Sequence, residues 1–155
     1  MAFAAFIKMP GVTGESTDDQ HDGWMGVLSF REGMRSTASP GGSGASSDVQ
    51  VEDFSFTKYI DLGTPTLRYG CCTRNVYDEV TFEVCQAGGD KHKYLEIKMS
   101  DVLIAAVESH GTCSQADGLP SEEVTLRFAK IEWTYSPVSA SGGVTMAQWD
   151  VAQAG

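Results

Sequence analysis

Basic residues are scarce in this sequence. Its 155 residues include 11 Lys and Arg against 21 Asp and Glu, a formal charge of −10. No run of three basic residues occurs. Nucleic-acid surfaces depend on clustered Lys and Arg that neutralise phosphates, so we predict no nucleic-acid partner. We interpret the acidity as a source of solubility that keeps free copies apart.

Long hydrophobic runs are also missing. The longest wholly apolar runs cover residues 1–7 (MAFAAFI) and 102–107 (VLIAAV). A membrane-spanning helix needs about 20 residues, so we predict no membrane insertion. Residues 1–8 have neither a basic start nor a convincing cleavage site. We therefore expect synthesis in the cytoplasm and no cleavable signal peptide.

Cysteine spacings typical of zinc sites are absent. The four cysteines are Cys71, Cys72, Cys85 and Cys113, with neither a CxxC nor a CxxH pair. Such pairs hold most structural zinc ions, so no metal site is predicted. Adjacent cysteines are poorly placed for a relaxed disulfide. We predict free thiols, with one disulfide formed after export as the alternative.

Catalytic motifs are missing too. His21, His92 and His110 lie in no HExxH, GxSxG or Cys-His setting. His92, between two lysines, is expected to be solvated. Three aspartates within residues 18–22 flank His21 but lack the ligand ladder of an EF-hand, so at most weak cation binding is expected there. We predict that the protein is not an enzyme and needs no cofactor.

Alternation of apolar and polar residues with period two is the main positive signal. It predicts strands at residues 80–85 and 94–99, joined by a Gly-containing hairpin loop at 87–91. Further strands are expected at 3–9, 24–31 and 144–151. Seven or eight strands leave little room for the crossovers that parallel pairing needs, so antiparallel pairing is predicted.

Two strand candidates change phase midway. The apolar positions are odd up to Val51 and even from Phe54, and they switch again between Phe128 and Ile131. A one-residue slip turns side chains to the other face, so a continuous strand needs a bulge at each switch. Because bulges increase twist, we predict an antiparallel β-barrel in a mainly β protein.

One short helix is predicted at residues 65–72. Thr64 can cap it, and Pro65 suits the first helical position, where no backbone N–H is needed. Gly70 inside the segment disfavours a long helix. An irregular turn is the alternative.

The segment 36–47 is small, polar and Gly-rich, so it cannot form a core and is expected to be an extended mobile loop. It is either a dispensable surface loop or a loop that orders against a partner. For the second case the candidate interface residues are Ser36, Thr37, Ser39, Pro40, Ser43, Ser46 and Ser47.

Several segments, in order and spacing, resemble the Hcp family of bacterial type VI secretion tube proteins. They are FIKMPGVTGES at 6–16, FSFTKYID at 54–61, TPTL at 64–67, EEVTL at 122–126 and WD at 149–150. The adjacent cysteines 71–72 and Cys113 depart from the family's pattern.

The resemblance implies one β-barrel domain over residues 1–155, closed into a homohexameric ring. Rings would stack into a tube that a contractile sheath ejects behind a VgrG-type spike, with small effector proteins in the lumen. It also implies secretion by the type VI route. We place ring-to-ring contact at the 36–47 loop.

Two alternatives compete with this interpretation. The chain could be the tail-tube protein of another phage-like contractile injection device. It could also be a monomeric β-barrel module that binds a sugar or protein through exposed Trp133 or Trp149. Both tryptophans lie in alternating segments, so core packing is the favoured role for each.

Overall fold

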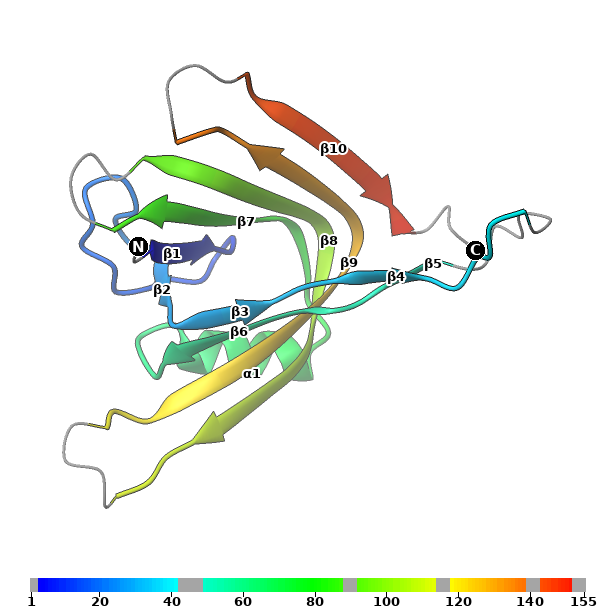
Figure 1. Cartoon of the computed structure of the whole chain (residues 1–155). Coiled ribbons are helices and arrows are strands. Elements are labelled where there is room, and N and C mark those ends of the chain that lie inside the picture. Colours follow the sequence, from blue (N-terminus) through cyan, green and yellow to red (C-terminus); the bar gives the residue numbers. More distant parts are fainter. Residues whose placement is uncertain (1–2, 42–48, 88–91, 114–117, 139–142, 152–155) are drawn as a thin grey trace.

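The computed structural model describes residues 3–41, 49–87, 92–113, 118–138 and 143–151. Within these ranges the chain is mainly β with one helix (Figure 1). The elements are β1 (Phe3–Lys8), β2 (Met25–Val27), β3 (Ser29–Arg31), β4 (Met34–Ser36), β5 (Val49–Val51), β6 (Phe54–Tyr59), α1 (Thr64–Cys72), β7 (Val76–Gln86), β8 (Lys93–His110), β9 (Ser121–Tyr135) and β10 (Thr145–Asp150).

The main sheet is antiparallel and curls into a nearly closed barrel. Its order is β2-β1-β7-β8-β9-β6-β3, and β10 also pairs with β9. The predicted strand at 24–31 closes the barrel, because β2 pairs with β1 while β3 pairs with β6. Between the two strands, the Leu28 N–H donates to the Thr57 carbonyl at 2.8 Å. The predicted fold class is therefore confirmed.

The phase change within residues 124–135 is accommodated differently from the prediction. β9 buries Phe128 and then Ile131, and β8 makes the matching switch between Val102 and Met99. These residues remain opposite one another, so no bulge separates β8 from β9 there. Asp101, which lies between the two β8 residues, has a positive φ of 52°. Neighbouring strands thus bend together, and register is kept.

The other phase change marks the end of a strand and the start of another. β5 pairs with β4 in a separate two-stranded sheet, whereas β6 joins the barrel. Glu52 and Asp53 lie between them, and the Glu52 N–H donates to the Gly33 carbonyl at 2.9 Å. The expected continuous, bulged strand is wrong here because the two halves have different partners. β4 and β5 form an arm that extends away from the barrel (Figure 1).

Aliphatic and aromatic side chains fill one continuous core inside the barrel. The Phe54 and Phe82 ring centroids are 5.0 Å apart, and Phe30 lies 4.7 Å from Phe82. Each of these rings comes from a different strand, β6, β7 or β3. The core therefore ties together strands that are not hydrogen-bonded neighbours in the sheet.

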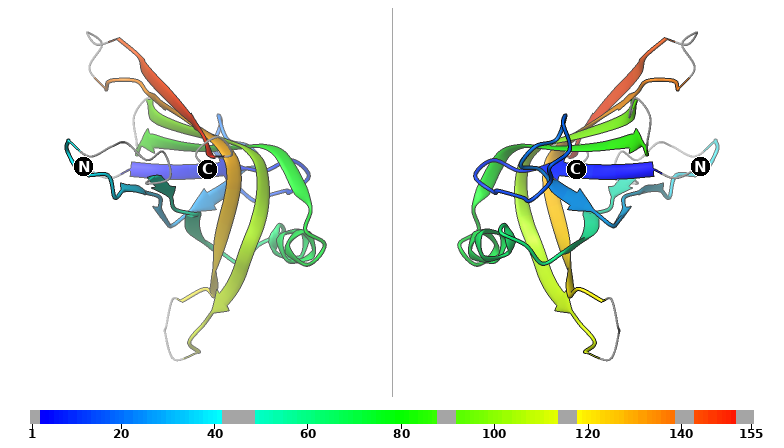
Figure 2. Two further views of the ribbon diagram at one scale, coloured as in Figure 1. Left: turned by 90° about the vertical axis from the view of Figure 1, so that its right-hand side faces the viewer. Right: turned by 90° about the vertical axis from the view of Figure 1, so that its left-hand side faces the viewer.

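Helix α1 lies at the side of the barrel, seen end-on in Figure 2. Pro65 occupies its first turn as predicted, but the N-cap is Gly63 and no side chain caps the helix. The Thr64 hydroxyl instead donates to Glu122 at 2.7 Å. Gly70 is buried, and a Cβ there would collide with the Tyr77 hydroxyl, so only glycine permits this close approach to β7.

Candidate functional site

Strand β10 is the least covered strand of the barrel. Its residues are exposed except Asp150, which is half-buried, and among the described residues it pairs with β9 alone. Met146 keeps 60% of its surface exposed and Trp149 keeps 38%. A strand with an open edge and bare apolar side chains is a template for pairing with another chain. β10 is therefore the leading candidate for an assembly surface.

An apolar groove of about 340 Å³ lies between β10 and the β4–β5 arm. Its lining residues are Met34, Val49, Val51, Trp133, Ala147, Gln148 and Trp149. Core packing is confirmed in part for Trp133, which is partly buried against the core. It is wrong for Trp149, which lies outside the core cluster, lines this groove and keeps 38% of its surface exposed. We call this groove and β10 the β10 surface.

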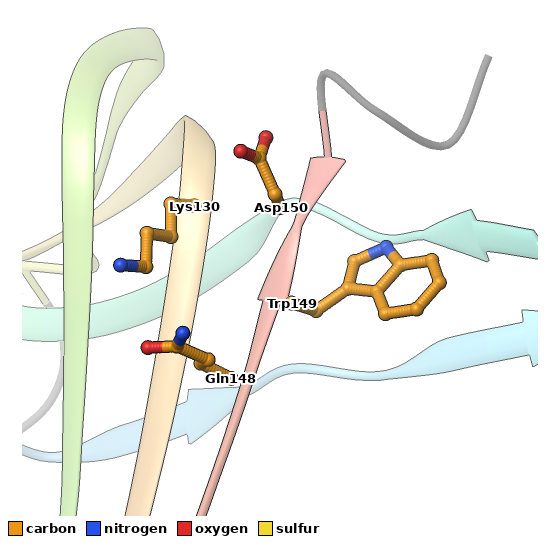
Figure 3. Close-up of a pocket in the computed structure, with 4 residues that line it drawn as sticks. All are labelled: Lys130, Gln148, Trp149 and Asp150. Atoms are coloured by element: carbon orange, nitrogen blue, oxygen red, sulfur yellow. The ribbon is translucent and has the colours of Figure 1, made fainter.

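The opposite face of β10 is more polar, with Gln148 and Asp150 beside the exposed Met146. Figure 3 shows Gln148 and Lys130 on one side of the strand and Trp149 on the other. Together with Asp150 these residues line a hollow of about 460 Å³. Asp150 and Lys130 are directly opposite one another in the β9–β10 register. The β10 surface thus combines an apolar side with a side that carries both charges.

A second apolar patch lies at the C-terminal end of β6. Tyr59, Ile60, Leu62 and Leu119 are all exposed, and a groove of about 440 Å³ runs beside the first two and Leu119. In Figure 1 this end of β6 is on the opposite side of the barrel from β10 and the arm. We call it the β6 patch. No sequence signal points to it, because isolated apolar residues at a strand end and in connecting segments carry no period.

The predicted interface loop is only partly described. Ser36 ends β4, and Thr37, Ser39 and Pro40 follow it, all exposed at the end of the arm. Ser43, Ser46 and Ser47 lie outside the described residues. No contact within the described part of the chain assigns a role to this loop, so its function as an interface stays a prediction.

A buried ion pair anchors α1 and the β6 patch to the barrel. Lys58 on β6 and Glu122 on β9 are at most 1% exposed, and Nζ lies 2.6 Å from Oε2. The Lys58 ammonium also donates to Asp61 at 2.8 Å and to the Tyr59 carbonyl at 2.9 Å. All three ammonium protons thus have acceptors, as a buried charge requires. The cluster holds residues 59–64 in place at the start of the helix.

The charges on the outer face of β7 and β8 form a second cluster. Lys93 donates to Glu96 at 2.9 Å and to Glu83 at 3.4 Å. Burial alone would lower the pKa of Lys93 and raise that of Glu96. Their mutual hydrogen bond and charge outweigh burial, so the net pKa of Lys93 lies above its usual value and that of Glu96 lies below.

The histidines occupy three different environments. His21 is buried, with Nδ1 2.6 Å from an Asp18 oxygen and Nε2 2.7 Å from a Glu83 oxygen. His92 is half-buried rather than solvated, with Nε2 3.3 Å from the Ser136 carbonyl oxygen. His110 is exposed at the end of β8. The three do not converge on one site.

No disulfide joins the four cysteines, all of which lie among the described residues. Cys85 is buried, Cys71 is half-buried, and Cys72 and Cys113 are exposed. Cys85 Sγ lies 4.0 Å from the His21 ring, a contact that sequence spacing could not reveal.

None of the described residues forms a helix that is both long and apolar enough to cross a bilayer.

Comparison with known proteins agrees with this architecture. Residues 6–135 match the family model described as "Type VI secretion system effector, Hcp". The chain is 36% identical to protein hcp1 of Pseudomonas aeruginosa over 160 residues, covering 99% of this chain and 98% of that protein.

Solved structures are similar over nearly their whole length. The crystal structure of Hcp1 from Salmonella typhimurium matches with a TM-score of 0.83 and 28% identity, covering 99% of this chain and 97% of that one. A type VI secretion system effector from Yersinia pestis matches with a TM-score of 0.78 and 31% identity, covering 95% and 99%. The sequence and the barrel together show that the chain belongs to the Hcp family of type VI secretion proteins.

Proposed function

We propose that this chain is the structural subunit of a type VI secretion tube. Residues 1–155 form one barrel domain, and six copies close into a ring. Rings stack into a tube that a contractile sheath ejects behind a VgrG-type spike, with small effectors carried in the lumen. The protein is made in the bacterial cytoplasm and leaves by the type VI route without a cleavable signal peptide. It performs no catalysis.

The observation that carries this proposal is the state of β10. A strand that pairs on one edge and keeps five of its six residues exposed buries too little apolar surface to be explained by the isolated barrel. Met146 and Trp149 would be covered if a neighbouring copy occupied the β10 surface. Tryptophan and methionine are enriched in protein interfaces, which supports this assignment.

The positions of the two apolar surfaces support a ring. The β10 surface and the β6 patch lie on opposite sides of the barrel (Figure 1). A contact between two different surfaces is head-to-tail, and such a contact closes into a ring when the rotation per copy divides the circle. A symmetric dimer would need only one surface and would leave the other exposed.

Light scattering after size exclusion tests the ring. We expect a six-fold mass for the native chain and a smaller mass for the double variant Met146→Ser/Trp149→Ser. Tyr69→Ser is the control, because Tyr69 is another large exposed side chain but lies on α1. A monomer at high concentration of the native chain would overturn the proposal. An unchanged six-fold mass for the double variant would exclude the β10 surface as the contact.

Stacking is assigned to the 36–47 loop. Electron microscopy of assembled tubes tests it with a variant in which residues 37–47 are replaced by a short Gly-Ser turn. We expect hexamers to persist and tubes to be impaired. Tubes of normal length would refute this role for the loop.

A further inference from the structure

Three residues with metal-binding side chains meet on the outer face of the barrel. Glu83 and Cys85 are two positions apart on β7 and therefore point to the same face. The segment before β2 crosses this face and brings in His21, which is 62 positions from Glu83 in sequence. The imidazole nitrogen, a carboxylate oxygen and the thiol sulfur all lie within 4.8 Å of one another.

The imidazole of His21 is held in one orientation. Its ring stacks on Phe6 with centroids 4.1 Å apart and planes 7° from parallel, and Trp24 packs edge-on at 4.8 Å. On the far side of the ring, the Asp18 carboxylate lies 2.6 Å from Nδ1. Nε2 is therefore aimed at Glu83 and Cys85 and cannot turn away. A carboxylate behind a histidine is the usual support for a metal-bound imidazole, because it orients the ring and raises its basicity.

We propose that His21, Glu83 and Cys85 bind one divalent cation of the zinc class. A mixed set of imidazole, thiolate and carboxylate suits Zn²⁺ and Co²⁺, whereas Ca²⁺ and Mg²⁺ prefer oxygen alone. Three protein ligands leave the fourth tetrahedral position to water.

The distances allow one ion to contact all three side chains. Zinc bonds are about 2.0–2.1 Å to nitrogen and about 2.3 Å to sulfur. The Nε2–Sγ separation of 4.0 Å is shorter than their sum of about 4.4 Å, so a single ion reaches both atoms. Nε2 and the Glu83 oxygen are 2.7 Å apart, close enough for a hydrogen bond and somewhat too close for two ligands of one ion. A small rotation of the Glu83 carboxylate opens this distance.

The cation replaces protons. Without it, a carboxylate oxygen faces each ring nitrogen, Asp18 at Nδ1 and Glu83 at Nε2. In the bound state Nε2 carries no proton, the Cys85 thiol has lost its proton to solvent, and Nδ1 donates to Asp18. The ion's two charges balance the Glu83 carboxylate and the new thiolate. Lys93, which also donates to Glu96, remains on the other Glu83 oxygen, away from the ion.

Access to the site is restricted. His21 and Cys85 are buried, and the Glu83 side chain is 12% exposed. An ion must enter from the Glu83 side or when the segment carrying His21 opens. An occupied site would link this segment to β7, so binding should raise the melting temperature.

The test uses Co²⁺, whose bond to a thiolate gives a charge-transfer absorption band in the near ultraviolet. The parent is Cys71→Ser/Cys72→Ser/Cys113→Ser, which keeps Cys85 as its only cysteine. We expect the band to saturate at one Co²⁺ per chain, with release of protons in weak buffer as the thiolate forms. Excess Zn²⁺ should abolish the band.

Further variants of the parent assign the ligands. Cys85→Ala should abolish the band, and Glu83→Gln should weaken Co²⁺ binding at least ten-fold. His110→Gln is the control for His21→Gln, because His110 is exposed. The proposal is overturned if the parent shows no band and no rise in melting temperature at saturating Co²⁺. It is also overturned if only the native chain shows the band, because the other cysteines would then bind the metal.

Discussion

Removing the Lys58 ammonium should destabilise the barrel more than any exposed charge deletion. Lys58→Met keeps most of the side-chain volume but leaves Glu122, fully buried, without its closest countercharge. Asp61 and the Tyr59 carbonyl also lose a donor. A charge that stays buried without its partner keeps its desolvation cost but loses most of the Coulombic attraction that offset it.

The expected cost can be bounded from the remaining contacts. Breaking a buried pair by removing one partner typically costs about 3–5 kcal/mol. Two donors to Glu122 survive: the Thr64 hydroxyl at 2.7 Å and the Arg68 guanidinium at 3.2 Å. Arg68 is 41% exposed, so solvent weakens its contribution. We therefore expect a loss near the lower end, about 3 kcal/mol.

Urea denaturation at fixed protomer concentration measures this loss. Lys98→Met is the matched control: Lys98 is 39% exposed and 3.8 Å from Glu96, so its change should stay within about 0.5 kcal/mol. The double variant Lys58→Met/Glu122→Met should recover at least half of the loss, because neither buried charge remains. A cost below about 1 kcal/mol for Lys58→Met would refute the reasoning.

Two further predictions concern packing and pH. Gly70→Ala should destabilise the protein by about 1–3 kcal/mol, because the new methyl group meets the Tyr77 hydroxyl. In chemical denaturation, Gly70→Ala should cost less when Tyr77→Phe has removed that hydroxyl. An equal cost of Gly70→Ala with Tyr77 and with Phe at position 77 would contradict the clash. Burial alone would raise the pKa of Glu96, but Lys93 outweighs it and lowers the pKa below the usual 4.5. Glu96 therefore contributes stability above that pH and loses it as the pH falls through its folded-state pKa. Glu96→Gln should lower the melting temperature at about pH 6 and have little effect at about pH 3, and a loss of equal size at both would exclude the ion pair as the cause.

The sequence predicts the barrel well because most strands face the core on one side, which imposes period two. It does not reveal strand partners. Residues 49–56 are therefore expected as one strand, although β5 and β6 belong to different sheets. For the same reason, alternation alone places Trp149 in the core, although the side chain is partly exposed. Period two shows that a strand has two distinct faces, but whether a face is buried depends on which other elements pack against it.

The polar clusters differ in how visible they are in the sequence. His21, Glu83 and Cys85 come together through a loop that crosses β7, and no spacing rule connects residues so far apart. The Lys58–Glu122 pair does leave a signal. Lys58 is in phase with Phe54 and Phe56, and Glu122 is in phase with Val124 and Leu126, so period two places both charges on the buried face. An unpaired charge is rarely tolerated on a buried face. When one strand carries a positive charge in phase with its core residues and a second strand carries a negative charge in the same way, the sequence therefore predicts a buried ion pair if the two strands are neighbours.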